Sequence, residues 1–319
     1  MNQKMGESII ASEDVFKNEE LRSLVDLYYE SSTKTLDIFN TVGSSANKAK
    51  QSIVSIRIAI QKFEKESDNG GNKKYEDTLE GLNKVKAMGD PFGDEYKNQM
   101  ESVRADQLIL LGKFHELAVK LDSKKKIFKK KRRWVTILYA TAAMSFLAAE
   151  ICICIVIPPL GLYTAVAAAT GVNYVIGTVG VLVNVVLKNR EKDLDRQKEV
   201  VDIMKDSTDV NIQMTNTVHS LVEKLTVSLS SILFSVEHAV VEREEVAVKN
   251  LMEAIRDEVD TFATAVKEVG EAAARCSTCV SSGKLQVLEH ITKLMSSRGK
   301  KPHLFERITN SMSSKGKKK

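Results

Sequence analysis

Proline, glycine and aromatic residues are scarce in this 319-residue chain, and cysteine is nearly absent. The sequence holds four prolines, 16 glycines, four cysteines and one tryptophan, and aromatic side chains make up 6% of it. Few helix breakers and few strand-forming aromatic residues favour an almost wholly helical protein, and residues 181–269 contain neither glycine nor proline. Four cysteines are also too few for the disulfide framework of a small secreted domain.

Familiar catalytic and targeting signatures are missing as well. The sequence contains no Walker A loop, dinucleotide fingerprint or nucleophile elbow, and its five histidines are scattered. We therefore expect a protein that is not an enzyme and that binds no cofactor or metal. The N-terminal residues show no apolar signal segment, and the chain carries no myristoylation or prenylation motif.

Charge is almost absent from one long stretch. Residues 134–187 contain a single formally charged side chain, Glu150. A bilayer core of about 30 Å is crossed by about 20 apolar helical residues, so this run is long enough for two crossings. Pro158 and Pro159 interrupt it near the middle, where they would break a continuous helix. The run therefore predicts a two-helix transmembrane hairpin.

Basic residues flank both ends of the apolar run. Eight of the ten residues at 124–133 are Lys or Arg, and Lys188, Arg190 and Lys192 follow the run. Positive charges beside membrane helices stay cytoplasmic, which predicts a multi-pass protein of the plasma membrane with both termini in the cytoplasm. No nucleic-acid-binding module is recognisable, so we expect the bilayer and its anionic cytoplasmic lipids as partners, and no nucleic acid. The predicted lipid contacts are Lys124, Lys125, Lys126, Lys129, Lys130, Lys131, Arg132 and Arg133.

Several polar and small residues are candidates for specific roles inside the bilayer. A charged group at that depth costs about 2.5–3.5 kcal/mol, so Glu150 either bonds across the hairpin, reaches the far interface or lines an ion or proton pathway. Asn173 is a candidate hydrogen-bond partner. Gly171 and Gly177 belong to a small-residue face that would pack within the hairpin or between copies, so a homo-oligomer stays open.

Apolar residues at three- and four-residue spacing mark amphipathic helices on both sides of the run. S-D-N-G-G-N at 67–72 and M-G-D-P-F-G at 88–93 break the first region, and a helix starting near Asp94 continues into the run. After the run, a bend is expected within 205–245, and 277–283 is expected to be a loop. These patterns predict an all-α fold, a long antiparallel helical bundle or coiled coil, with a parallel homodimeric coiled coil as the alternative.

The predicted organisation has eight segments. They are a disordered N-terminus at 1–12, a cytoplasmic helical region at 13–126, a basic juxtamembrane segment at 127–133, a transmembrane helix at 134–157, a turn at 158–161, a second transmembrane helix at 162–187, a cytoplasmic helical region at 188–296 and a disordered basic tail at 297–319.

Cys276 and Cys279 form a lone C-x-x-C pair. A zinc site would need further ligands at suitable spacing, and a thioredoxin-like role would need a βαβ context. We expect the two cysteines to serve simply as small residues at a helix end, with redox sensing and metal binding as weaker alternatives.

Three segments carry a resemblance to a known family. They are L-V-D-L-Y-Y-E-S-S-T-K-T-L-D-I-F at 24–39, D-P-F at 90–92 and I-P-P-L-G at 157–161. With the hairpin and its basic flank, they make nearly the whole chain similar to the plant-specific domain of unknown function 677 family, also described as integrin-related or 14A-like. The resemblance implies a non-enzymatic membrane protein that links the membrane to the cytoskeleton or cell wall. The predicted topology leaves only a few residues around Pro158 outside the cell, which disfavours direct binding of an extracellular ligand.

A membrane-anchored scaffold or adaptor is the function that these features favour, with unidentified cytoplasmic protein partners bound by the helical bundle. The alternative is an oligomeric pore or channel that resembles helical pore formers, with several hairpins assembled around Glu150. A hairpin buried in a soluble helical protein, or one that inserts only conditionally, is also compatible with the run.

Overall fold

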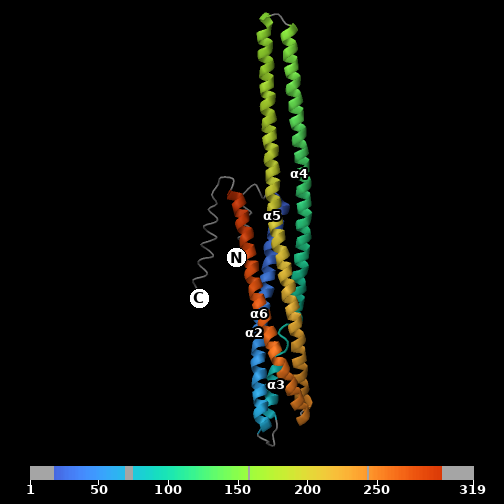
Figure 1. Cartoon of the computed structure of the whole chain (residues 1–319), viewed down its shortest axis with the longest axis vertical. Coiled ribbons are helices and arrows are strands. Elements are labelled where there is room, and N and C mark those ends of the chain that lie inside the picture. Colours follow the sequence, from blue (N-terminus) through green and yellow to red (C-terminus); the bar gives the residue numbers. More distant parts are fainter. Residues whose placement is uncertain (1–17, 69–74, 157–158, 243, 297–319) are drawn as a thin grey trace. The chain divides into compact units, whose positions relative to one another are not determined.

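The described part of the chain is helical throughout, apart from short connections (Figure 1). The structure is a computed structural model that describes residues 18–68, 75–156, 159–242 and 244–296, with the side chains of all of them except 143, 146–178, 242, 295 and 296. Within these residues there is no strand, which confirms the all-α prediction. The helices are α2 (Glu19–Asp68), α3 (Glu76–Met88), α4 (Asp94–Val156), α5 (Pro159–Glu242) and α6 (Glu245–Ser296).

Two compact units divide the described residues. Unit 1 contains residues 24–112 and 204–290, and unit 2 contains 113–203 together with the short stretches 18–23 and 291–296. Each of the two predicted helical regions, 13–126 and 188–296, therefore contributes to both units. Their assignment to the cytoplasm stays a prediction.

Unit 1 is an antiparallel bundle of α2, α4, α5 and α6, with the short helix α3 beside α2. Cross-helix contacts run in opposite residue order along neighbouring helices, as in the pairs Thr33–Lys284, Arg57–Asp260, Ser207–Gly283 and Ser231–Glu258. The antiparallel bundle is thus present in unit 1.

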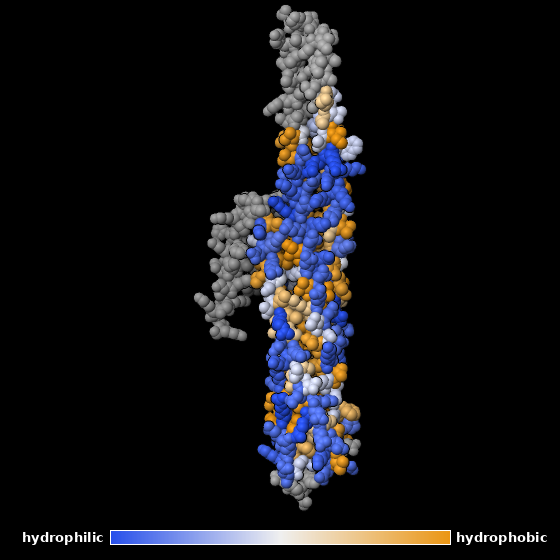
Figure 2. Space-filling model, in the orientation of Figure 1, coloured by the Kyte–Doolittle hydropathy of each residue, from blue (hydrophilic) through white to orange (hydrophobic). Residues whose placement is uncertain are grey.

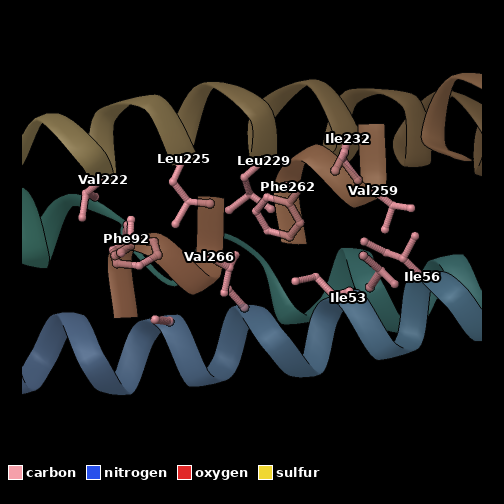
Figure 3. Close-up of a cluster of buried hydrophobic side chains, with 14 of the residues drawn as sticks. Ile53, Ile56, Phe92, Val222, Leu225, Leu229, Ile232, Val259, Phe262 and Val266 are labelled. Carbon is pink, nitrogen blue, oxygen red and sulfur yellow. The ribbon is translucent and has the colours of Figure 1, made fainter. Parts of the chain in front are cut away.

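The core of unit 1 is a continuous apolar seam. Its α5 members follow one another at alternating four- and three-residue steps, and none is more than 2% exposed: Val218, Val222, Leu225, Leu229, Ile232, Val236 and Ala239. Figure 3 shows several of these side chains directed at Phe262 and Val259 of α6 and at Phe92. Full burial of each large apolar side chain stabilises the fold by about 1.5–3 kcal/mol. The apolar three- and four-residue spacing predicted after the run is confirmed in this part of α5.

The start of α3 is capped by a residue of the preceding helix. Tyr75, just before α3, has a left-handed backbone (φ 66°) and provides no side-chain cap. The Glu66 carboxylate of α2 accepts hydrogen bonds from the backbone N–H of Asp77 (3.0 Å) and Thr78 (3.2 Å) and from the Thr78 hydroxyl (2.5 Å). Tyr75 is held in its conformation by stacking on Phe63, with ring centroids 5.1 Å apart. The predicted helix break after α2 is therefore present, and the Glu66 carboxylate of α2 fixes the start of α3.

Of two sequence predictions on the C-terminal half, one is wrong and one is confirmed. Helix α6 continues unbroken from Glu245 to Ser296, so 277–283 is not a loop and the Cys276–Cys279 pair is not at a helix end. The physical reason is packing: a Cβ built on Gly283 would lie 2.9 Å from the Ser207 hydroxyl of α5, so glycine serves close helix approach here. The bend expected within 205–245 is confirmed, because α5 ends at Glu242 and α6 begins at Glu245, at the end of the predicted range.

The predicted membrane helices are parts of longer helices. Residues 134–156 form the end of α4, and α5 begins at Pro159, inside the predicted turn at 158–161. A proline at the first helical position loses no intrahelical hydrogen bond, because that N–H would have no partner within the helix.

Replacing Gly283 by Ala tests the close approach of α5 and α6. In the wild-type background, the helix-propensity gain of about 1 kcal/mol should be offset, because the new methyl displaces the Ser207 hydroxyl from its 2.8 Å hydrogen bond with the Tyr28 hydroxyl. With Ser207→Ala already present, Gly283→Ala should stabilise by about 0.5–1 kcal/mol. Thermal unfolding of the four variants, followed by circular dichroism, measures the difference.

Gly112→Ala is the matched control, because nothing lies within 4 Å of a Cβ at that helical position. It should stabilise equally in both backgrounds. An equal effect of Gly283→Ala in both backgrounds would contradict the packing account.

Candidate functional site

The predicted lipid-contact residues lie on α4 within unit 2, where α4 and α5 run side by side in opposite directions (Figure 1). Three ion pairs join the two helices, in an order that fixes the antiparallel register: Asp122–Lys198, Lys125–Asp195 and Arg132–Glu191. The N···O distances are 2.6, 2.5 and 2.9 Å, respectively. Glu191, with a side chain only 12% exposed, is the most enclosed of the six. Lys125 and Arg132 therefore pair α4 with α5 in unit 2.

The remaining predicted cations take no part in these pairs. Lys124, Lys126, Lys129, Lys130 and Arg133 are exposed, and none has an ion-pair partner in the part of the chain that the structure describes. Lys131 is exposed too, and its ammonium group lies 6.0 Å from the centre of the Phe128 ring. The structure thus divides the eight basic residues into two structural cations and six that are available to an outside partner.

An exposed apolar surface directly follows the basic residues on both helices. We call it the apolar collar, and its members are between 42% and 67% exposed: Trp134, Ile137, Leu138, Met144, Val179, Val181, Leu182, Val185 and Val186. Figure 2 shows orange, hydrophobic atoms meeting a blue, hydrophilic band in this part of unit 2. Contiguous exposed apolar surface of this kind is typical of a protein or membrane contact.

Close packing of α4 on α5 begins within the collar. A Cβ built on Gly180 would lie 2.7 Å from Cγ of Tyr139, so only glycine lets the tyrosine ring rest against the α5 backbone. Sequence reasoning did not predict this contact between Tyr139 and Gly180. The only feature of the sequence that could have indicated it is the presence of a small residue on one helix and an aromatic residue on the other.

The four predicted intramembrane residues Glu150, Gly171, Asn173 and Gly177 fall among the residues whose side chains lie outside the described part. Their pairing and packing roles stay predictions. The same holds for the core of the predicted hairpin at 146–178.

One helical stretch among the described residues, within Val179–Val241, is long and apolar enough to cross a membrane, with a mean hydropathy of 1.3. The described residues therefore give one such stretch, not the two of the predicted hairpin. The first part of that range carries too many charges to cross a membrane, among them Lys188, Arg190 and Glu191. The apolar stretch therefore lies toward Val241, in unit 1. Only 28% of it is buried, because one side packs in the seam and the other is exposed.

A polar layer interrupts the apolar seam of unit 1, and sequence reasoning missed it. The Gln107 side-chain amide of α4 donates hydrogen bonds to the Thr35 hydroxyl of α2 and the Thr215 hydroxyl of α5, both at 3.0 Å. All three residues are at most 1% exposed. The available signal was position, since Gln107 takes a seam place between Val103 and Leu110.

A lysine lies near this layer. The Lys284 ammonium group donates to the Thr33 hydroxyl at 2.9 Å and lies 5.8 Å from the centre of the Tyr29 ring. Burial lowers the pKa of Lys284 and raises that of Tyr29. Both effects stabilise the neutral forms.

The cysteine pair has no partners that would make a metal centre. Cys276 and Cys279 are free thiols within α6, and burial raises the pKa of Cys276, which disfavours the reactive thiolate. Across the described residues, no three His, Cys, Asp or Glu side chains gather closely enough to hold a metal ion.

Comparison with known proteins relates the chain to plant sequences. Residues 1–291 match a family model described as "Protein of unknown function (DUF677)". The chain is 39% identical over 303 residues to "UPF0496 protein At5g66660" of Arabidopsis thaliana, a match that covers 92% of this chain and 75% of that protein. It is 31% identical over 304 residues to "UPF0496 protein 1" of Oryza sativa subsp. japonica, covering 92% and 77%.

Among solved structures, the chain is similar to the SmhB pore of the tripartite alpha-pore forming toxin Smh from Serratia marcescens. The TM-score is 0.52 at 7% identity, and the match covers 84% of this chain and 96% of that one. At so low an identity, the likeness shows a shared helical fold alone.

Asp122→Asn tests the electrostatic clasp, by which we mean the three ion pairs Asp122–Lys198, Lys125–Asp195 and Arg132–Glu191 between α4 and α5. The Lys198 ammonium group, bonded to both carboxylate oxygens, holds the pKa of Asp122 below its usual range. A depressed carboxyl pKa contributes stability above its ordinary value and loses it as pH falls through the depressed value. We expect Asp122→Asn to destabilise by about 0.2–1 kcal/mol at pH 7, the range for exposed pairs, and the difference to shrink progressively as the pH falls below the ordinary carboxyl pKa.

Thermal unfolding across this pH range checks the expectation. Asp257→Asn is the control, because the Asp257 carboxylate has no ion pair among the described residues. A deficit for Asp122→Asn that stays constant with pH would rule out the clasp.

Proposed function

The chain belongs to the DUF677 family of unknown function, as its sequence resemblance predicted, and we propose that it is a non-enzymatic, membrane-anchored helical adaptor. The observation that carries the proposal is the apolar collar of unit 2, which directly follows the exposed cations of 124–133. This order, cations and then an aromatic residue and aliphatic side chains, is the order of groups at a cytoplasmic membrane surface.

A water-facing collar would be costly. Nine large apolar side chains exposed next to one another make a surface that monomeric soluble proteins rarely leave uncovered. Insertion beside acyl chains removes that surface from water at about 25 cal/mol per Å². Trp134 would then sit at the interface, where amphipathic rings are favoured.

The topology that we propose follows from the pairing of α4 with α5. Two antiparallel helices enter and leave a bilayer on the same side, so the segments 134–157 and 162–187 would form a two-pass hairpin with both termini in the cytoplasm. The flanking basic residues support that orientation at the plasma membrane.

The adaptor role rests on an unpartnered apolar stripe of unit 1. Val227, Phe234 and Val241 recur every seven residues on the outer side of α5 and are 72%, 63% and 67% exposed. A stripe with this spacing fits a helical protein partner. A link to the cytoskeleton would have to use such a surface of the bundle, because the predicted outward segment around Pro158 is short.

Pore formation is the second candidate function. The apolar collar also favours it, because a helical pore subunit needs an exposed apolar surface that enters the bilayer. Glu150 would then line the path of ions, and the small-residue face of Gly171 and Gly177 would join neighbouring copies.

Trp134, the one tryptophan of the chain, is a built-in probe of membrane contact. After reconstitution of the full chain, its fluorescence should be quenched strongly by lipids brominated near the headgroup and weakly by lipids brominated near the acyl-chain end, because the proposed position is interfacial. Steady-state emission with the two brominated lipids measures the depth.

The control moves the probe to unit 1 with Trp134→Phe and Tyr29→Trp together. This variant should show little quenching by either lipid, because Tyr29 lies on α2 within the bundle. Absence of quenching at Trp134, or equal quenching at both positions, would overturn the membrane-anchor proposal.

Dye release from vesicles separates the two candidate functions. For an anchor, we expect reconstituted protein to release no more dye than protein-free vesicles. For a pore, release should rise with protein concentration and fall several-fold in Glu150→Gln, because a carboxylate in the path would govern ion passage. Release that Glu150→Gln leaves unchanged would contradict the assigned role of Glu150.

A further inference from the structure

Four exposed cations lie on one face of α4. Lys126, Lys129, Lys130 and Arg133 are related by the spacing i, i+3, i+4 and i+7, which places residues on a single side of a helix with neighbouring Cβ atoms about 5–6 Å apart. We call these four residues the cation face. They span about 10 Å along the helix axis, at a rise of about 1.5 Å per residue.

The cation face gathers four cations that have no close carboxylate partner in the described part of the chain. Lys34, Lys84, Lys86 and Lys120 all pair with carboxylates, and on α4 itself Lys125 and Arg132 pair with α5. None of the four residues of the cation face has an ion pair among the described residues, and only Lys126 acts at longer range on a carboxylate, that of Asp122. Like charges at i and i+4 destabilise a helix by about 0.2–0.5 kcal/mol per pair. The face is therefore a local concentration of positive charge that is open to an anion from outside the chain.

The next turn of the same face is apolar. Ile137, four residues beyond Arg133, is 56% exposed and belongs to the apolar collar, as does the adjacent Trp134. A nucleic acid would bring phosphates against these apolar side chains as well. A bilayer instead matches both parts, with headgroups at the cations and acyl chains at Ile137 and Trp134.

We propose that the cation face binds a membrane lipid of the phosphatidylinositol bisphosphate class, whose headgroup carries several phosphates. This inference rests on the proposed membrane anchor and adds a headgroup preference to it. Each phosphate monoester carries about −1.5 to −2 charges, so one such headgroup presents enough negative charge for three or four cations within two helical turns. To supply the same negative charge, several phosphatidylserine molecules would have to gather at this one place. Arg133 adds a planar fork suited to phosphate, and the lysines add point charges.

The test uses the full chain in nonionic micelles, titrated with short-chain lipids. Calorimetry would compare a phosphatidylinositol bisphosphate with a phosphatidylserine at equal total charge. We expect the bisphosphate lipid to bind at least about tenfold more tightly, since each well-placed basic residue contributes about 1 kcal/mol. Equal binding of the two lipids would overturn the proposal and leave the membrane anchor untouched, because the anchor is decided by the quenching of Trp134.

Two variants with the same loss of charge locate the site. Lys126, Lys129, Lys130 and Arg133 are changed together to Gln in one, and Lys124, Lys131, Lys188 and Lys192 in the other. The first should lose the preference for the bisphosphate lipid, and the second should keep it. Equal losses would overturn the proposal by showing attraction to charge alone. A third variant, Lys126→Arg with Lys129→Arg and Lys130→Arg, should retain binding, which separates lost charge from lost folding.

Two further ligands identify the source of the phosphate. Free inositol trisphosphate should bind more weakly than the lipid, because it lacks acyl chains to meet the apolar collar. Binding as tight as that of the lipid would show a soluble ligand and overturn the proposal. A short DNA duplex that bound more tightly than the lipid would overturn it in favour of nucleic acid.

Discussion

Burial of the α5 seam is the constraint on which unit 1 depends. Seven apolar residues from Val218 to Ala239 follow one another at heptad steps with almost no exposure, and no single neighbour could cover them all. Helix α6 supplies Phe262 and Val259, α2 supplies Ile56, and Phe92 enters from the turn before α4. Because the seam keeps its phase over six turns, its partners must run alongside it, which gives long helices that lie antiparallel or parallel to α5.

Sequence periodicity was sufficient to find these helices but not all of their ends. Breaks marked by several agreeing residues, such as S-D-N-G-G-N and D-P-F-G, are where α2 ends and α4 begins. The expected loop at 277–283 rested on small residues alone, and small residues also serve close packing, as Gly283 does against Ser207. Composition cannot separate the two uses, because the second depends on a residue more than 70 positions away in the chain.

The candidate site was predictable in part for a similar reason. The number of cations at 124–133 is visible in the sequence, but their division into clasp and free face depends on Asp195 and Glu191, which α5 brings opposite Lys125 and Arg132. A heptad argument also fails at Gln107, since a polar residue in a seam is an exception unless its partners are known. Thr35 and Thr215 become partners only once three helices are in register.

The Gln107 layer limits how the helices of unit 1 can move. Its amide donates to one hydroxyl on each of two neighbouring helices, and its carbonyl oxygen already has no partner among the described residues. A shift of α4 by one turn along its axis would leave the amide donors unpaired in an apolar seam as well, at about 1–3 kcal/mol for each unsatisfied group. An apolar residue at this place would set no such barrier, because an apolar side chain would lose no hydrogen bond when it moved by one turn along the seam. Piston-like sliding of α4 is therefore costly, whereas opening or rotation of helices away from this layer is not penalised in the same way.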